Sequence, residues 1–363
     1  MRDAIILSSW NWEVFNVPER VALALASRRA RVLYCGMPES RFRRGAGGID
    51  GLRSMHPQIH AFTPEYLGEK FSSVGLLRDW QWKKVAQDIL REAKGSGLRN
   101  PVFIYSHVKH LAPLCREMRA EGLPLVHICM DYPEQYQKEL IELSDRTFVI
   151  PKTVFRNLRD KYDGKVEWIP QSIHLNGNAD AIPADGTPEF SALAGIPHPR
   201  LGYLGPLHGR VNLDLMRDVL ELHPNWHFVC FGGAEMLSVQ NAHGLPWMAG
   251  DKIPACVAGF DAGVMPYSLS DPKNLHCVPL KLFDYFLAGA PVVSTRVLSL
   301  AEYGDLIYFG DTQAEFAQAI ERALSEPLDS AQRAARREVA RSHSTDALGQ
   351  RLEELLMSER ARL

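Results

Sequence analysis

One segment of the chain, residues 261–295, constrains the fold more than any other. It reads DAGVMPYSLSDPKNLHCVPLKLFDYFLAGAPVVST, in which two apolar, strand-length runs flank a polar loop and a short helical stretch. Pro279 suits the first turn of that helix, and Gly289 suits its C-terminal end. A buried strand, a helix and a second buried strand in succession form the repeating unit of a parallel α/β sheet. The segment therefore predicts such a sheet in this half of the chain.

The predicted helix carries two charged residues on its polar half. At about 100° per residue, that half consists of Lys281, Asp284, Tyr285 and Ala288. A cation in the first turn opposes the helix dipole, so helix stability does not account for Lys281. An anionic ligand at the helix N-terminus would account for it, and Asp284 could then accept hydrogen bonds from the hydroxyls of an attached sugar. The alternative is a solvent-exposed ion pair between the two side chains.

Buried-strand candidates alternate with helical stretches along the whole chain. They lie at 4–8, 31–35, 102–106, 125–130, 147–150 and 166–169, and then at 200–204, 227–231, 261–265, 291–294 and 306–309. Continuous apolar strands separated by amphipathic helices predict parallel sheets covered on both faces. Between the two series, residues 176–190 are rich in Gly, Pro, Asn and Asp and have no periodicity, which indicates an interdomain linker.

Residues 261–295 closely resemble the donor-binding signature of GT-B glycosyltransferases, especially the GT4-like bacterial enzymes that build surface polysaccharides. The match is carried by Asp261, Gly263, Pro266, Tyr267, Pro279, Leu280, Lys281, Leu282, Asp284, Tyr285, Gly289, Pro291, Val292 and Val293. It extends upstream to 200–233 and downstream through 316–324. The resemblance implies an α/β fold of GT-B architecture, with two Rossmann-like domains whose parallel sheets face each other across a cleft.

The resemblance also implies a domain organisation. An acceptor-binding Rossmann-like domain would span residues 1–175, followed by a linker over 176–197 and a donor-binding Rossmann-like domain over 198–328. Residues 329–363 are helix-forming and strongly charged. In GT-B relatives such a tail crosses back to pack on the first domain, and we expect the same here.

For the second domain, the resemblance implies a site for a nucleotide-diphosphate sugar, and we favour a UDP-sugar. Lys281 would bind the diphosphate and Asp284 the ribose. The other positions expected to line this donor site are Gly205, Arg210, Gly232, Met248, Tyr267, His276, Val278, Pro279 and Leu280. Arg210 follows glycines that let the backbone approach an anion, although a surface role is the alternative. Two positions depart from the family pattern: Asp284 replaces a glutamate, and His276 replaces the first acid of the E-x7-E form.

Asp131 is the candidate general base for the acceptor. It directly follows the predicted strand 125–130, at the sheet edge where α/β folds usually bind ligands. An acid there could deprotonate an attacking sugar hydroxyl, and Asp131 resembles the acceptor-side aspartate of inverting GT-B relatives. The alternative, compatible with the first, is that Asp131 caps the following helix. On the acceptor side, Trp10 and Trp12 could stack on a sugar ring or a lipid-linked acceptor, or could simply pack.

Residues 41–44 and 71–91 predict contact with an anionic membrane. Both segments are basic, and the second adds Trp80 and Trp82. Such segments lie well on an anionic bilayer, which would suit an enzyme with a polyprenyl-linked acceptor. The alternative for the second segment is a core helix with a charged outer face.

Several other functions lack the motifs they need. No Asp-x-Asp occurs, so the metal clamp of GT-A transferases is missing, and no histidine spacing predicts a metal site. We therefore expect no metal and no other cofactor: Lys281, helix N–H groups and Arg210 would stabilise the leaving diphosphate. The run GAGG at 45–48 fails the dinucleotide fingerprint because Asp50 replaces the third glycine. No feature predicts a nucleic-acid partner.

The sequence predicts a cytoplasmic protein, peripheral at the inner face of the membrane if the membrane contact is made. Its six cysteines are scattered without a C-x-x-C pair and suit reduced core thiols. No apolar run is long enough to span a bilayer, and no cleavable signal peptide is visible.

The leading interpretation is a metal-independent glycosyltransferase acting on a glycan or polyprenyl-linked acceptor in bacterial surface polysaccharide or glycoconjugate synthesis. The signature does not decide between retention and inversion. Two alternatives keep the fold: a sugar-nucleotide 2-epimerase, which needs no acceptor, and a catalytically silent nucleotide-binding scaffold.

Overall fold

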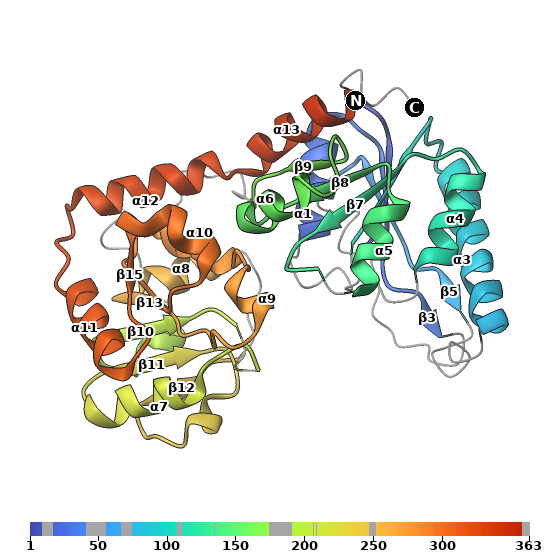
Figure 1. Cartoon of the computed structure of the whole chain (residues 1–363). Helices are drawn as coiled ribbons and strands as arrows, with labels where there is room; N and C mark the ends of the chain where they lie inside the picture. Colours follow the sequence, from blue (N-terminus) through green and yellow to red (C-terminus); the bar gives the residue numbers. More distant parts are fainter. Residues whose placement is uncertain are drawn as a thin grey trace. The chain divides into compact units, whose positions relative to one another are not determined.

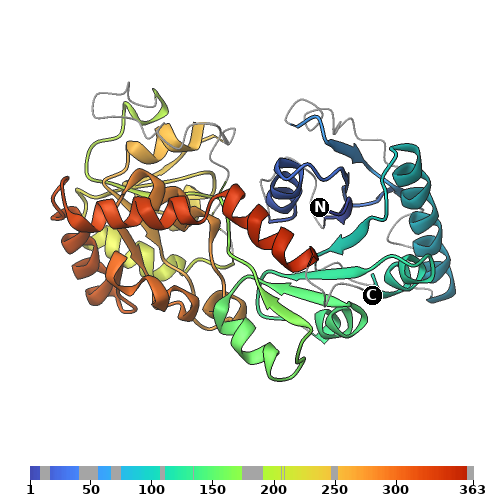
Figure 2. The ribbon, with the colours of Figure 1, turned by 90° about the horizontal axis from the view of Figure 1, so that it is seen from above.

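The computed structural model describes residues 1–8, 17–40, 56–66, 75–106, 111–133, 135–173, 191–205, 207, 209–246 and 252–357. The chain divides into two compact units. Unit 1 comprises Met1–Ser172 together with Thr345–Leu363, and unit 2 comprises Ile173–Ser344. Figures 1 and 2 show the elements of both units, coloured along the sequence.

In the described part of unit 1, seven parallel strands form one sheet in the order β4-β2-β1-β6-β7-β8-β9. Their bounds are β1 (Ala4–Leu7), β2 (Val32–Cys35), β4 (Ile59–Phe62), β6 (Val102–Tyr105), β7 (Leu125–Cys129), β8 (Arg146–Val149) and β9 (Val166–Trp168); β3 (Glu39–Ser40) pairs with β5 (Glu65–Tyr66). The helices are α1 (Val17–Ser27), α3 (Gly75–Gly95), α4 (Ala112–Ala120), α5 (Gln135–Leu143), α6 (Lys152–Arg159) and α13 (Thr345–Met357). β1 lies mid-sheet between β2 and β6, the order of a doubly wound fold.

In the described part of unit 2, six parallel strands form one sheet in the order β12-β11-β10-β13-β14-β15. They are β10 (Arg200–Tyr203), β11 (His227–Cys230), β12 (Ala242–Gly244), β13 (Ala262–Met265), β14 (Val292–Ser294) and β15 (Ile307–Phe309). The helices are α7 (Leu213–Leu222), α8 (Ile253–Ala258), α9 (Pro272–Leu275), α10 (Leu280–Ala288), α11 (Gln313–Leu324) and α12 (Ala331–Ser342), with 3-10 turns η3 (Ser191–Leu193), η4 (Ala234–Leu237) and η6 (Leu298–Leu306).

The eleven predicted strands are all present, and the prediction of parallel α/β sheets is confirmed. Four strands were missed: β4 and β12 of the two large sheets, and the short β3 and β5, which pair with each other. β4 and β12 lie at a sheet edge, where one flank is unpaired and the side chains are only partly buried. Because the apolar runs that reveal buried strands are absent from such edges, sequence patterning does not detect them.

The C-terminal tail divides between the two units. α13 packs on α1, and a Cβ atom on Gly349 would come within 2.8 Å of the Ala24 carbonyl oxygen, so this contact requires a glycine. α12 instead belongs to unit 2 and packs on α10. The tail therefore returns to unit 1 through α13, whereas residues 329–344 belong to unit 2.

A buried ion pair fixes α12 within unit 2. Arg336 is fully buried and donates two hydrogen bonds to Glu326, at 2.7 and 2.8 Å, while its Nε donates to the Leu306 carbonyl oxygen. The residues expected to end the linker also belong to unit 2, because Leu193 and Ile196 are buried in it. Unit 2 therefore includes residues that precede the predicted boundary at 198.

Replacing Arg336 tests the role of this ion pair. Arg336→Ala is expected to lower the free energy of unfolding by about 3 kcal/mol, because the buried Glu326 carboxylate loses its two shortest charged hydrogen bonds and keeps only the longer charged contact, with Arg333. Arg341→Ala is the matched control, since its i,i+3 pair with Glu338 is exposed and should contribute less than about 0.5 kcal/mol. Urea unfolding measures both variants. Equal effects in the two variants would contradict the assigned role.

Candidate functional site

The strand order of unit 2 determines where its ligand site lies. On one side β10 pairs with β11, the next strand in the chain. On its other side it pairs with β13, which comes later in the sequence. The loops that leave the carboxyl ends of β10 and β13 therefore diverge, and α/β sheets bind ligands at such a switch point. The residues at this edge include Tyr203, Gly205 and Tyr267.

The helix α10 carries its first turn to this switch point. It runs from Leu280 to Ala288; Pro279 is the N-cap in an extended conformation, and Gly289 ends the helix in the left-handed region at φ 70°. Both predicted boundaries are confirmed, and Lys281 lies in the first turn. The free N–H groups of that turn and the Lys281 ammonium together form a positively polarised helix end.

Lys281 is partly buried and rests on aromatic rings. Its Nζ lies 3.5 Å from the ring centroid of Tyr203 and 5.8 Å from that of Tyr267. Burial lowers the pKa of Lys281 to about 7; the Arg210 charge adds to this lowering, and Cys277 and Asp284 oppose it. The alternative of a solvent-exposed lysine is therefore wrong. An anion placed beside this amine would restore its charge.

Tyr285 holds α10 in place, a role that the sequence analysis missed. It was assigned to the polar half of the helix, but it is fully buried and faces the sheet. Its hydroxyl donates a hydrogen bond to the Gly202 carbonyl oxygen at 3.0 Å and accepts one from the Leu204 N–H at 2.8 Å. The tyrosine ring covers Gly263, where a Cβ atom would come within 2.6 Å.

Lys281 lies one helical turn before Tyr285 and so shares its sheet-facing side. Tyr285 covers the strands, and Lys281 projects beyond their carboxyl ends over Tyr203. The sequence contained a signal for this arrangement: Gly263 leaves room on its strand for the Tyr285 ring, as Gly202 does on the neighbouring strand for the Phe260 ring.

Two glycine loops lie beside the lysine. Gly205 has φ 125°, and a Cβ atom there would come within 3.4 Å of the Lys281 Nζ. Gly232 has φ 80°, and its carbonyl oxygen accepts a hydrogen bond from the Leu207 N–H. The Phe231 N–H donates in turn to the Gly205 carbonyl oxygen. The loops after β10 and β11 thus support each other, and both glycines adopt conformations that a side chain would strain.

Arg210 is held close to the same point. Its carbonyl oxygen accepts hydrogen bonds from the Ser268 N–H at 2.9 Å and from the fully buried Asn274 side chain at 3.1 Å. These bonds join the β10 loop to the loop after β13. Because the Arg210 charge acts on Lys281, the structure gathers two cations at one edge of the sheet.

The remaining predicted donor residues surround α10 or lie outside the described residues. Tyr267 and Val278 are buried, and Asp284 and Leu280 are partly buried. Burial lowers the pKa of His276, which ends α9 and accepts a hydrogen bond from Ser299 at its carbonyl oxygen. Met248 is not among the described residues.

In unit 1, Asp131 lies just past the carboxyl end of β7 and is partly buried. The Cys129 thiol donates to its carbonyl oxygen at 3.2 Å. The described part of α5 begins at Gln135, and residue 134 lies outside the described residues, so the capping role of Asp131 stays a prediction. Trp10, Trp12 and residues 41–44 lie outside the described residues, as do 71–74 of the segment 71–91.

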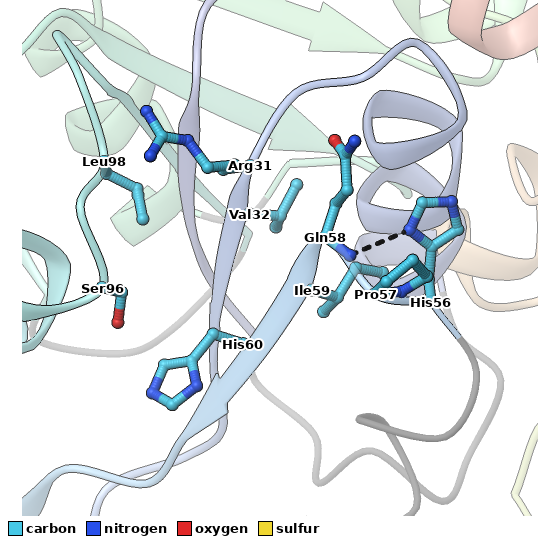
Figure 3. A pocket seen from close by; sticks show the side chains of 9 residues that line it. All are labelled: Arg31, Val32, His56, Pro57, Gln58, Ile59, His60, Ser96 and Leu98. Atoms are coloured by element: carbon cyan, nitrogen blue, oxygen red, sulfur yellow. Dashed lines mark hydrogen bonds between the residues drawn. The ribbon is translucent and has the colours of Figure 1, made fainter.

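A separate polar hollow opens at the other edge of the unit 1 sheet. Figure 3 shows Arg31, His56, His60 and Ser96 around a cavity of about 320 Å³. It adjoins the starts of β2 and β4, opposite the edge that carries Asp131. Arg31 is paired with Asp3, and His60 contacts Glu92. Among the described residues no cluster could hold a metal ion, and no helix could cross a membrane.

Comparisons with known proteins agree with this geometry. Residues 212–356 match a family model described as "Glycosyl transferase-like". The putative teichuronic acid biosynthesis glycosyltransferase TuaH of Bacillus subtilis (strain 168) is 27% identical over 174 residues. That alignment spans 44% of this chain and 44% of the relative, less than half of each.

Solved structures match over nearly the whole chain. The α,α-trehalose-phosphate synthase (UDP-forming) from Burkholderia vietnamiensis has a TM-score of 0.68 at 16% identity, with 100% of both chains covered. Anabaena Alr3699/HepE in complex with UDP-glucose has a TM-score of 0.68 at 14% identity, covering 97% of this chain and 99% of that one. This chain has the GT-B fold. The resemblance seen in residues 261–295 is therefore confirmed, and GT-B architecture accounts for both parallel sheets.

The burial of Lys281 predicts an unusual titration. In NMR spectra of protein with isotope-labelled lysine, one side chain is expected to titrate near pH 7. The signal should be missing from Lys281→Arg. This variant is needed for assignment because burial also lowers the pKa of Lys165. If Lys281 instead titrates with the bulk of the lysines, the amine is hydrated and the described site is wrong.

Proposed function

We propose that this GT-B chain is a glycosyltransferase that transfers a sugar from a nucleotide-diphosphate sugar to an acceptor hydroxyl. One observation carries the proposal: the N-terminus of α10 brings Lys281 to the switch point of the unit 2 sheet, over Tyr203. A partly dehydrated ammonium beside free helix N–H groups attracts a diphosphate strongly, because little water competes for the charge.

Lys281 and Arg210 would stabilise the leaving nucleoside diphosphate as the glycosidic bond to the donor breaks. Both are fixed before substrate arrives, Lys281 by α10 and Arg210 by hydrogen bonds to its backbone. Preorganised positive charge of this kind lowers the barrier for a departing anion. We propose that it replaces a divalent metal, so that no metal or other cofactor is needed. Asp284, one turn after Lys281, would accept hydrogen bonds from the ribose hydroxyls.

We favour a UDP-sugar as the donor. The printed names of two structures of the same fold support this choice, one a UDP-forming synthase and the other a complex with UDP-glucose. Gly205, Gly232, Met248, Tyr267, His276, Val278, Pro279 and Leu280 are the other proposed donor contacts.

For the acceptor we propose a glycan or lipid-linked glycan of bacterial surface polysaccharide, which the teichuronic acid name of the relative supports. Asp131 would accept the proton of the attacking hydroxyl as the new bond to the anomeric carbon forms. We propose a cytoplasmic enzyme: all six cysteines are buried and none forms a disulfide, as suits a reducing compartment.

Donor binding is tested by calorimetry with UDP. Lys281→Ala is expected to raise the dissociation constant roughly 10- to 150-fold, because it removes a charge-assisted contact to the diphosphate. Lys252→Ala is the matched control, since Lys252 is an exposed lysine of the same unit. Near-normal affinity in Lys281→Ala would refute the donor site.

The role of Asp131 is tested by separating transfer from binding. Asp131→Asn is expected to slow transfer about 100- to 10,000-fold and to leave UDP affinity unchanged, because only the proton acceptor is lost. Asp160→Asn, at an exposed aspartate of unit 1, should retain full activity.

The same assay distinguishes the alternatives. A UDP-sugar incubated without acceptor would yield a new sugar-nucleotide isomer if the protein were an epimerase. UDP binding without any transfer by the unmodified protein would favour the scaffold. Transfer at full rate by Asp131→Asn would exclude Asp131 as the base.

A further inference from the structure

Large apolar side chains gather at the start of α3. Leu76 is 86% exposed, Leu77 41% and Trp80 51%. Positions three and four apart are neighbours on a helix, so these three side chains form one exposed surface, the α3 patch. The other large exposed apolar residues in the described part of the chain are dispersed over several elements: Tyr132, Leu222, Met236, Leu298, Leu328 and Met357. Three large apolar side chains within six residues need a physical reason, since water disfavours such a surface.

Basic side chains flank the α3 patch. Lys84 places its Nζ 5.7 Å from the Trp80 ring centroid, and Lys83 and Arg78 lie on the same two turns. The only acid among residues 75–84 is Asp79, which contacts Arg78; Glu117 of α4 pairs with Lys83. Long cationic side chains beside exposed leucine and tryptophan are characteristic of surfaces that insert shallowly into an anionic bilayer.

The α3 patch lies at the same edge of the unit 1 sheet as Asp131. α3 ends at Gly95 and the chain enters β6 at Val102, so the C-terminal end of the helix lies at the amino edge of the strands. Its first turn must then lie toward the carboxyl edge, where β7 ends before Asp131. Since the helix is about 30 Å long and the strands are only about 17 Å, its first turns extend beyond that edge. Figure 1 shows α3 alongside α4, with both helices outside this sheet.

We propose that the α3 patch docks unit 1 on an anionic lipid bilayer and that the acceptor is a lipid-linked glycan presented at that surface. The second part rests on the proposed glycosyl transfer; the first does not. With Leu76, Leu77 and Trp80 in the headgroup region, the end of unit 1 that carries Asp131 lies close to the membrane. A glycan can then reach Asp131 while its lipid carrier stays in the bilayer.

A bilayer fits the α3 patch better than a second protein does. Stable protein interfaces bury about 800 Å² on each partner, far more than three side chains supply. A symmetric contact with a second copy would also bring Arg78 and Lys84 toward the same residues of the partner, where like charges repel. A bilayer requires no matching shape and offers the opposite charge.

Vesicle flotation tests the docking surface. The full chain is mixed with vesicles of phosphatidylcholine alone or of phosphatidylcholine with phosphatidylglycerol. We expect flotation with the anionic vesicles only, weakened by salt. Leu76→Ser/Trp80→Ser should reduce partitioning at least about tenfold, because two exposed apolar side chains are lost. Lys84→Gln should reduce it about fivefold.

Matched controls make the result decisive. Leu328→Ser removes a 76%-exposed leucine from unit 2 and should float like the unmodified protein. UDP affinity should be equal in all variants. No flotation of the unmodified protein, equal flotation of Leu76→Ser/Trp80→Ser, or a self-association that this double variant abolishes would each overturn the proposal.

The acceptor class is tested with the same glycan on two carriers. One carrier is a long polyprenyl diphosphate embedded in anionic vesicles, and the other is a short, water-soluble tail. Leu76→Ser/Trp80→Ser should lose transfer to the embedded glycan and keep transfer to the soluble one. If this double variant transferred sugar equally well to the embedded and the soluble glycan, the lipid-linked assignment would be wrong. Absence of transfer by the unmodified protein to either carrier would refute the proposed function while leaving the flotation result standing.

Discussion

The Tyr285 hydroxyl, hydrogen-bonded to the backbone of β10 on both sides of Tyr203, is the contact on which the unit 2 site depends. It joins α10 to the central strand while the ring fills the space above Gly263. A helix fixed at this point has no freedom to slide or turn. Its first turn is therefore held at the carboxyl edge of the sheet, where the backbone N–H groups and the Lys281 side chain meet.

The position of the helix explains the chemistry of Lys281. Because the amine lies over Tyr203 and is shielded from water, its charged form is disfavoured and its pKa is lowered. Aromatic rings compensate only part of the lost hydration. A shielded amine of this kind favours an anion beside it, and the proposed diphosphate would supply that negative charge. Arg210 increases the same tendency.

The sequence predicted the sheets and α10 well because buried parallel strands and a proline-to-glycine helix leave strong patterns. It failed for Tyr285 because a helical wheel assumes one buried face. α10 is covered by the strands on one side and by α12 on the other. On the α12 side, Phe283 stacks on His343, the residue that ends α12, with the two ring centroids 4.4 Å apart.

A ligand-binding role for Lys281 is predicted from position alone, because the helix dipole disfavours a cation there. The burial of Lys281 could not be predicted, because burial depends on two tyrosines that lie 78 and 14 residues earlier in the chain, at the ends of separate strands. Similarly, Trp80 and Trp82 look alike in the sequence, yet Trp82 joins the core of unit 1 and Trp80 does not. Only the helix register in the folded unit separates a packing residue from an exposed one.

The most direct test of the account is calorimetry of UDP binding in buffers with different heats of ionisation, one pH unit above the pKa of Lys281. Because the amine is mostly neutral in the free protein and charged beside a diphosphate, binding is predicted to take up about one proton from the buffer, and affinity is predicted to fall as the pH rises further. The uptake should disappear in Lys281→Arg, whose guanidinium remains charged. Binding without proton uptake in the unmodified protein would contradict the claim that Lys281 receives the diphosphate.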